Sequence, residues 1–347
     1  MIVAMKPTAI SVVIPTCNRA NLISRAIESV LPQTESDDEL IVVDDGSIDN
    51  TAQIVASYGD RIRYVRTGNR GAGAARNRGV REATRPFVAF LDSDDEWMPW
   101  HNQVLRSFMA ARPDLLFCFT NYAARYSDGS ERRFSLETHE GRHLNWHEIM
   151  GPSGQASSVI SLPDGMEDFQ YFEGDNLYLS QCSHSYVCVN ALIVRRIEAG
   201  DNLRFAEDTP TAEEWECGAL LARAGKSVYL HCETSWAHHH KGPRLTHADM
   251  FEHGSSRLAF MRRVWGADQQ FLRDHREVYE RVLRIEQINR VGGLLLRGCT
   301  RKAREEIAEM NNPPLSYSFL VRLSGPLAKG LLDCRRAIKS FLRRKDR

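Results

Sequence analysis

Short apolar segments alternate with helix-patterned segments over the first third of the chain, and few folds accommodate such an alternation. The apolar segments are rich in β-branched and aromatic residues and cover residues 9–14, 40–43, 62–65, 87–91 and 115–119. Runs this short and this continuously apolar are typical of strands buried on both faces. Between them, apolar residues recur at helical spacing over residues 22–31, 48–58, 73–83 and 99–109. The alternation predicts an α/β fold with an open, mostly parallel sheet flanked by helices.

Polar residues follow three of the predicted strands directly. Pro15 cannot donate to a sheet ladder and should end the first strand, so that Thr16–Arg19 form a loop. Asp44–Ser47 follow the second strand, and Asp92–Asp95 follow the fourth. Ligands of such sheets bind beyond the carboxyl ends of the strands. We therefore expect these three loops to share one binding site.

The loop after the fourth strand carries three carboxylates, Asp92, Asp94 and Asp95. Like charges so close together repel and raise one another's pKa, so such a cluster is usually stabilised by a cation. Carboxylate oxygens are the ligands that Mg²⁺ and related ions prefer. A divalent-metal site is the favoured interpretation, and a polar turn in which Trp97 covers the core is the alternative.

A stretch rich in small residues, 71–79, opens the third predicted helix. It lacks the Gly-Lys-Ser/Thr ending of a P-loop, and it does not follow the first strand as a dinucleotide fingerprint does. Its small residues would let the backbone approach a bound group closely. Arg76 and Arg78 then face either a phosphate or base, or solvent on an exposed helix face.

Patterns weaken beyond residue 120. We predict strands over residues 187–194 and 227–230, with a helix between them that ends at Gly225. Glu213 and Glu214 fall in the first turn of that helix, where the helix dipole stabilises anions whatever their role. Among the three consecutive histidines at 238–240, we expect one imidazole to be a metal ligand.

The charge is balanced overall but not locally. The 45 basic and 45 acidic residues give a net charge of zero, so the whole chain has no general attraction to nucleic acid. Residues 247–347 are helix-prone, and residues 313–347 contain nine basic and two acidic residues, a net charge of +7. Leucines interleave with these charges. Two interpretations remain open, a helix lying on an anionic membrane surface and a packed helix with a solvated basic tail.

The eight cysteines are scattered without Cys-x-x-Cys pairs, in a chain large enough to fold without disulfides. We expect them to be reduced. The sequence shows neither a secretory signal pattern nor an apolar run long enough to span a membrane. We therefore expect a cytoplasmic location, with peripheral contact to the cytoplasmic face of the membrane through the basic tail.

Four motifs, in order, resemble the signatures of the family 2 inverting nucleotide-sugar glycosyltransferases, which have the GT-A fold. They lie at residues 12–19, 42–49, 73–79 and 90–94. The resemblance is strong over about residues 9–100, looser to residue 246, and only compositional beyond. It implies a GT-A domain at 1–246, with a nucleotide-sugar-binding half at 1–120 and an acceptor-side half at 121–246. Residues 247–347 would form a helical C-terminal region.

The resemblance also implies roles for individual residues. Asp94 and Asp92 would hold Mn²⁺ or Mg²⁺, and His239 or His240 would contact the metal or the diphosphate. The family's acidic pair before a tryptophan falls on Glu213 and Glu214, and its second position, usually Asp and here Glu214, would be the general base. That departure leaves the base open between the two glutamates. The nucleotide-sugar would be bound by Pro15, Thr16, Asn18, Arg19, Asp44, Asp45, Arg76, Asp92 and Ser93.

The implied activity is the metal-dependent, inverting transfer of a hexosyl or N-acetylhexosaminyl group. The donor would be a nucleotide-diphosphate sugar, a UDP-sugar foremost, and the acceptor a hydroxyl group of a glycan or lipid-linked saccharide. Arg244 could help to stabilise the leaving diphosphate. Two alternatives remain: a nucleotide-sugar-binding protein without turnover, and a sugar nucleotidyltransferase, although the turn at residues 14–18 lacks the latter's glycine-rich loop.

Overall fold

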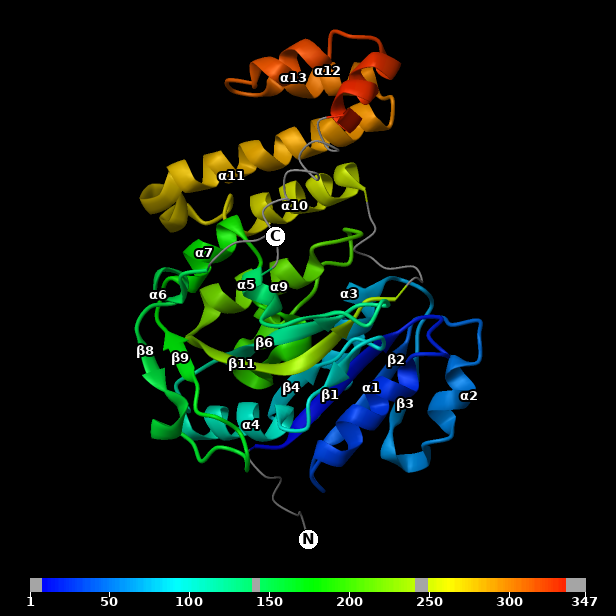
Figure 1. Ribbon diagram of the computed structural model, residues 1–347, viewed down its shortest axis with the longest axis vertical. Coiled ribbons are helices and arrows are strands. Elements are labelled where there is room, and N and C mark those ends of the chain that lie inside the picture. Colours follow the sequence, from blue (N-terminus) through cyan, green and yellow to red (C-terminus); the bar gives the residue numbers. More distant parts are fainter. Residues whose placement is uncertain (1–7, 139–143, 241–248, 335–347) are drawn as a thin grey trace. The chain divides into compact units, whose positions relative to one another are not determined.

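The structure is a computed structural model that describes residues 8–138, 144–240 and 249–334. The chain divides into two compact units, each with its own core. The first contains Met1–Asp208 and Glu213–Gly242, and the second contains Thr209–Ala212 and Pro243–Arg347. The first unit is built on a sheet and the second on helices (Figure 1).

The sheet of the first unit has 11 strands within the described residues, and its main path runs β3-β2-β1-β4-β10-β6-β11-β9-β8. β1 lies parallel to β2 and β4, and β2 lies parallel to β3. β10 pairs antiparallel with both β4 and β6, and β11 runs parallel to β6. The strands are β1 (Ile10–Thr16), β2 (Glu39–Asp44), β3 (Arg63–Arg66), β4 (Phe87–Phe90), β5 (Glu96–Trp97), β6 (Phe117–Arg125), β7 (Glu131–Arg132), β8 (Ser153–Gln155), β9 (Gln170–Glu173), β10 (Leu192–Arg195) and β11 (Ser227–His238).

The predicted α/β fold with a mostly parallel sheet is confirmed. All five predicted strands of the first third are present, but the predicted fourth and fifth strands are not neighbours, since β10 lies between β4 and β6. The predicted strand at 187–194 is shorter than expected. Residues 189–191 form a 3₁₀ turn, η5 (Val189–Ala191), and β10 begins only at Leu192.

Pro15 does not end the first strand, contrary to our prediction. β1 continues to Thr16, and Pro15 lies opposite Val43 of β2. The Val13 carbonyl accepts from the Leu91 N–H on the β4 side, so Pro15, two residues further on, faces the same side. The pairing with β4 ends at Val13. The missing N–H of Pro15 therefore falls where no ladder bond is required.

Helices cover both faces of the sheet (Figure 1). Alternate residues of β1 enter opposite cores, Val12 and Ile14 on one face and Val13 on the other. α1 (Ile23–Val30), α2 (Thr51–Ala56) and α4 (His101–Ala111) contribute to the first core, and α3 (Ala72–Glu82) and α9 (Glu213–Ala224) contribute to the second. The shorter helices are α5 (Ser135–Thr138), α6 (Trp146–Ile149), α7 (Leu177–Ser183) and α8 (Arg196–Ala199).

The small residues of α3 contact protein, where we expected them to approach a bound group. A Cβ atom at Gly79 would lie 2.2 Å from Val13 Cγ1 of β1, and one at Gly73 would lie 2.3 Å from the Ala206 carbonyl oxygen. Both positions therefore require glycine, because any side chain would collide with a strand or a backbone segment. These glycines bring α3 close to β1 and to the segment that precedes α9.

The second unit is an assembly of helices, as expected for the C-terminal region. It contains α10 (Met250–Val264), α11 (Gln269–Leu296), α12 (Thr300–Glu309), α13 (Leu315–Leu320) and a helix described over residues 325–334. Asp249 caps α10 by accepting from the backbone N–H groups of Phe251 and Glu252. Val291, Leu295, Ile307, Leu320 and Leu332 are among its core residues. Among the described residues, no helix has the length and apolarity to cross a membrane.

Candidate functional site

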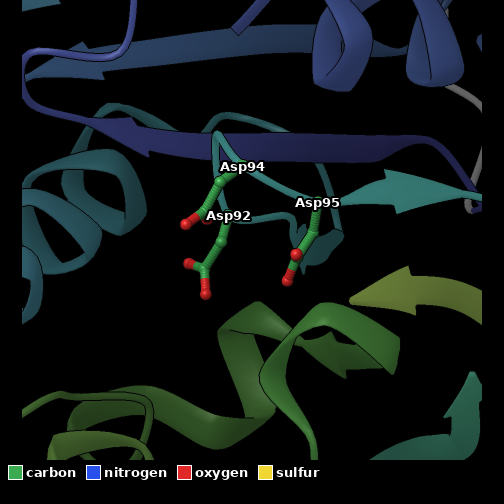
Figure 2. A group of neighbouring side chains, drawn as sticks. All are labelled: Asp92, Asp94 and Asp95. Carbon is green, nitrogen blue, oxygen red and sulfur yellow. The ribbon is translucent and has the colours of Figure 1, made fainter. Parts of the chain in front are cut away.

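Three carboxylates gather just beyond the carboxyl end of β4. Ligand atoms of Asp92, Asp94 and Asp95 all lie within 4.8 Å of one another, and Figure 2 shows the side chains of Asp92 and Asp94 next to each other. β4 is buried along its whole length, and the chain turns away from the sheet immediately after it. The predicted acidic cluster is therefore present, and its oxygen atoms suit a divalent cation.

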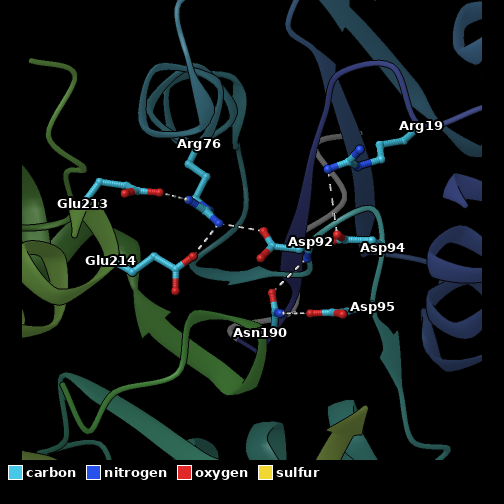
Figure 3. Close-up of polar contacts among 8 residues, drawn as sticks. All are labelled: Arg19, Arg76, Asp92, Asp94, Asp95, Asn190, Glu213 and Glu214. Carbon is cyan, nitrogen blue, oxygen red and sulfur yellow. Dashed lines mark hydrogen bonds and ion pairs between the residues drawn. The ribbon is translucent and has the colours of Figure 1, made fainter. Parts of the chain in front are cut away.

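Asp95 holds this loop in place through hydrogen bonds to two other segments. Its Oδ1 accepts from the backbone N–H of His238, and its Oδ2 accepts from the side-chain amide of Asn190 (Figure 3). Asn190 also accepts, through Oδ1, from the backbone N–H of Asp92 at 2.8 Å. With both oxygens of Asp95 engaged, Asp92 and Asp94 are the carboxylates with more capacity to bind an ion. Sequence reasoning missed Asn190, because nothing in the pattern of η5 singles it out.

Asp94 lies among basic groups. Its Oδ2 lies 2.8 Å from His240 Nε2 and 4.0 Å from the Arg19 guanidinium. Arg25 donates to its backbone carbonyl. His239, the other candidate, instead stacks on Tyr126 with ring centroids 4.4 Å apart. Of the two histidines, His240 is therefore the one that reaches the acidic cluster. Arg244 lies outside the described residues.

Arg76 is the centre of a charge cluster whose members come from α3, the acidic loop and α9. Its side chain is 2% exposed, and its Nη2 donates to both Asp92 and Glu214 at 2.6 Å (Figure 3). Its Nη1 lies 3.1 Å from Glu213. The resemblance places Arg76 at the base and ribose, whereas its guanidinium here lies among three carboxylates. Burial by itself lowers the pKa of Arg76, but the charges of the three carboxylates outweigh this effect and raise the pKa above its ordinary value.

The two glutamates differ in accessibility. Both lie in the first turn of α9, but the Glu213 side chain is 8% exposed and that of Glu214 is 37% exposed. Desolvation by the surrounding protein raises the pKa of Glu214 to about 7, the Asp92 and Glu213 charges act in the same direction, and Arg76 opposes them. A carboxyl group with such a pKa can accept a proton near neutral pH. Glu214 is therefore better suited than Glu213 to act as a base.

Asn77, next to Arg76 in sequence, helps to place α9. Its side-chain amide donates to the Phe205 carbonyl at 2.8 Å and accepts from the Phe205 N–H at 2.8 Å. The ring of Phe205 in turn lies 5.4 Å from the Arg76 guanidinium. This reciprocal pair holds the backbone that leads toward Glu213. Asn77 lies within the motif at residues 73–79, but the sequence pattern assigned it no role.

The aspartates after β2 are strongly hydrogen-bonded. Asp44 accepts from the Ser47 N–H at 2.8 Å and from the Tyr64 hydroxyl at 2.5 Å. Burial and this bond to a carboxylate raise the pKa of Tyr64 to about 12. Asp45 accepts from the backbone N–H groups of Arg70 and Gly71 at 2.9 and 2.6 Å. Both carboxylates therefore order the loops on which a donor would bind, whatever further contact they make.

The loops after β1 and β2 are connected through Asn18. Its backbone lies in the left-handed region, with φ of 54°, which asparagine adopts more readily than most residues. Its N–H donates to Ser47 Oγ at 2.8 Å, and its Oδ1 accepts from the Ile48 N–H at 2.9 Å. Thr16, at the end of β1, pairs with Asp44 at the end of β2, and Ser93 is buried within the acidic loop. The predicted convergence of the three loops is present.

Relatives of known sequence match roughly a quarter to a third of the chain. An uncharacterized glycosyltransferase of Nostoc sp. is 47% identical over 94 residues, 26% of this chain and 29% of that protein. YibD, an uncharacterized glycosyltransferase of Escherichia coli, is 39% identical over 109 residues, 30% of this chain and 31% of that protein. The aligned segments span between 17% and 36% of the curated relatives considered.

Solved structures share the fold over nearly the whole chain. TarS of S. aureus, residues 1–349 in complex with UDP-GlcNAc, has a TM-score of 0.59 at 17% identity and covers 97% of this chain and 92% of that one. The mannosyltransferase PcManGT from Pyrobaculum calidifontis, in complex with GDP-Man and Mn²⁺, has a TM-score of 0.51 at 14% identity, over 95% and 89% of the two chains. The fold is accordingly of the GT-A type.

A family model matches the part of the sequence that holds the three loops. Residues 11–172 match the model of the family described as glycosyl transferase family 2. This range includes Thr16–Arg19, Asp44–Ser47 and Asp92–Asp95, which converge at the carboxyl ends of β1, β2 and β4. Over residues 11–172, slightly less than half of the chain, the sequence is similar to glycosyl transferase family 2.

Proposed function

We propose that this protein is a metal-dependent, inverting glycosyltransferase. It transfers a hexosyl or N-acetylhexosaminyl group from a nucleotide-diphosphate sugar, in our proposal a UDP-sugar, to a hydroxyl group of a glycan or lipid-linked saccharide. One observation carries the proposal: Arg76 Nη2 bonds both Asp92, in the acidic loop, and Glu214, the candidate base. Arg76 thereby holds the acidic loop, where the donor diphosphate would bind, close to the proposed proton acceptor.

The acidic loop fits a divalent cation by its chemistry. Asp92 and Asp94 supply carboxylate oxygens, and His240 approaches Asp94 within 2.8 Å, so these three residues would hold Mn²⁺ or Mg²⁺. When bound, the ion would neutralise the negative charge that develops on the leaving diphosphate. Asp95 is committed to Asn190 and His238, and its task is to hold the loop in shape.

Glu214 is the proposed general base. It accepts the proton of the acceptor hydroxyl while that oxygen attacks the anomeric carbon of the donor. The new C–O bond forms on one face of the sugar as the bond to the diphosphate breaks on the other, and a nucleoside diphosphate leaves. A single displacement inverts the anomeric configuration, so an α-linked donor gives a β-glycoside. Glu213, buried against Arg76, holds the guanidinium in place.

The donor-binding part of the proposal rests on the loops after β1 and β2. Thr16 lies opposite Asp44, and Asn18 bonds Ser47 of the loop that follows β2, so these loops supply polar groups of the kind that a base and ribose require. The two solved neighbours support a nucleotide-sugar but differ in its identity, since one holds UDP-GlcNAc and the other GDP-Man. We propose a cytoplasmic location and no nucleic-acid partner, in keeping with the net charge of zero.

The test is a transfer assay on the full-length protein. A thermal-shift screen of UDP- and GDP-sugars with Mn²⁺ would first select the donor, because a bound ligand stabilises the fold. Donor hydrolysis and transfer would then be measured with and without EDTA, and in Asp94→Ala beside Asp128→Ala, an exposed aspartate whose side chain bonds Ser130. We expect activity to be lost with EDTA and in Asp94→Ala only.

Three outcomes would contradict the proposal. Full activity in EDTA and in Asp94→Ala would remove the metal from the mechanism. Release of pyrophosphate from a nucleoside triphosphate and a sugar phosphate, without any transfer, would identify a nucleotidyltransferase. Tight metal-dependent UDP binding without turnover on a broad acceptor panel would identify a binding protein.

A further inference from the structure

The second unit exposes an unusual concentration of large apolar side chains. Four of the seven exposed large apolar residues in the part of the chain that the structure describes lie within 17 positions, and they are 50% to 88% exposed. We call them the C-terminal apolar patch: Leu315, Phe319, Leu327 and Leu331. Single exposed apolar residues are ordinary on a protein surface, but four of them on two consecutive helices indicate a contact surface.

The patch is distinct from the core-facing side of its helices. Leu320 of α13, and Ala328 and Leu332 of the following helix, are buried in the core of the second unit. Leu327 and Leu331 are four residues apart, as are Leu315 and Phe319, so each pair forms a second apolar stripe on its own helix. Within the described residues, Leu320, Ala328 and Leu332 are therefore buried by packing, whereas the side chains of the C-terminal apolar patch are exposed to solvent.

Basic residues are interspersed with the patch in the sequence. Arg322 and Lys329 are exposed, and residues 313–347 carry a net charge of +7 in a chain whose total is zero. Residues 335–347 lie outside the described part, but their sequence holds seven basic residues and one acidic residue. Ile338 and Leu342 there continue the spacing of Leu327 and Leu331. Apolar and basic side chains in this mixture are typical of segments that lie at an anionic membrane surface.

We propose that the C-terminal apolar patch docks on an anionic lipid bilayer. Its four apolar side chains enter the interface, while Arg322 and Lys329 contact lipid phosphates. A nucleic acid would neutralise the positive charge but would leave the four apolar side chains exposed to water. A lipid surface can bind the basic residues and also bury the apolar side chains, so it is the partner that we propose. Stable peripheral binding generally requires two such signals, and this unit supplies both.

The experiment measures partition of the full-length protein onto vesicles by sedimentation. Vesicles of phosphatidylcholine alone are compared with vesicles that also contain phosphatidylglycerol. We expect binding to the anionic vesicles only, weakened by salt, since exposed charges are screened beyond about 10 Å at 0.1 M ionic strength. Vesicle binding needs no substrate, so this test stands apart from the proposed transferase activity.

Two variants separate the apolar and the basic contributions. Leu327→Gln with Leu331→Gln should lower the partition constant roughly tenfold, because two buried apolar side chains are lost. Arg322→Gln with Lys329→Gln should lower it by about fivefold per residue, on anionic vesicles alone. The control is Ile48→Gln, which removes an even more exposed apolar side chain, 93% accessible, from the first unit. Unchanged thermal melting would show that each variant folds.

Three results would overturn the proposal. The first is a wild-type protein that stays in the supernatant with anionic vesicles. The second is equal vesicle binding by the wild type and the Leu327→Gln, Leu331→Gln variant. The third is a dimer of the wild type that this variant dissociates, with no vesicle binding by either, because a second copy of the chain would then cover the patch. Light scattering on the same samples detects that dimer.

Discussion

Arg76 and Glu214 form an ion pair at 2.6 Å although 138 residues separate them along the chain. The same Nη2 atom bonds Asp92, so one guanidinium nitrogen joins the acidic loop to the start of α9. A planar, permanently charged group can satisfy several carboxylates at once. Arg76 thus allows Asp92, Glu213 and Glu214 to lie close together, and it couples the geometry of the proposed metal site to that of the proposed base.

The choice of Glu214 as the base can be tested by isosteric replacement. Glu214→Gln should lower kcat roughly a hundred- to ten-thousandfold with little change in the KM of the donor, because a general base acts in the transition state. Steady-state kinetics of transfer would measure both constants. Glu213→Gln is the matched variant and should lower kcat less than Glu214→Gln does. The assignment would be reversed if Glu213→Gln were the inactive variant and Glu214→Gln the active one.

The pKa of Glu214 predicts a particular pH profile. Its pKa is raised to about 7, so below that pH an increasing share of the carboxyl is protonated and unable to accept a proton. We expect kcat/KM to fall about tenfold per unit below pH 7 and to level off above it. A pH–rate profile of the wild type checks this. A profile that is flat between about pH 5.5 and 8 would contradict it, since an unperturbed carboxylate titrates near 4.3.

Replacement of Arg76 should affect both folding and activity. Arg76→Met leaves three carboxylates without their common partner, and breaking a buried charge network of this kind costs about 3–5 kcal/mol of unfolding free energy. Urea unfolding would measure the loss. Arg78→Met is the control on the same helix, since Arg78 pairs with Glu82 at the surface and should cost about 1 kcal/mol or less. Equal losses in the two variants would refute a special role for Arg76.

His240 and His239 should differ in their effect on metal binding. His240→Gln removes an imidazole 2.8 Å from Asp94 and should weaken Mn²⁺ binding on the order of tenfold or more. His239→Gln removes a ring that stacks on Tyr126 and should leave the affinity unchanged. Titration of Mn²⁺ by calorimetry would compare the two. An unchanged affinity in His240→Gln would exclude that residue as a ligand.

The packing of α3 on β1 predicts an unusual response to alanine. Gly79→Ala should stabilise an ordinary helix, but here the new Cβ would lie 2.2 Å from Val13 Cγ1. We expect a net loss of about 1–3 kcal/mol. Gly68→Ala is the same substitution at a position where no heavy atom lies within 4 Å, and it should be nearly neutral. Thermal or urea unfolding of both variants would decide, and a neutral Gly79→Ala would show that the strand can yield.

Local sequence determined the framework of this protein. Apolar runs and helical periodicity report on the nearest few residues, and they predicted the first strands, their helices and the polar loop at the end of each. Because the carboxyl ends of parallel strands meet at one edge of a sheet, the approach of Thr16, Asp44 and Asp92 followed from these local patterns. The acidic loop was evident for the same reason.

The tertiary structure decided how the site is completed, because the contacts that complete it join distant parts of the chain. β10 enters between β4 and β6 and brings Asn190 to the acidic loop, 98 residues from Asp92. Only the path of the chain after β11 shows that His240, and not His239, reaches Asp94. Likewise, only the packing of α9 beside α3 places Arg76 among three carboxylates. Periodicity carries no information about such pairings, since they depend on which buried surfaces fit together.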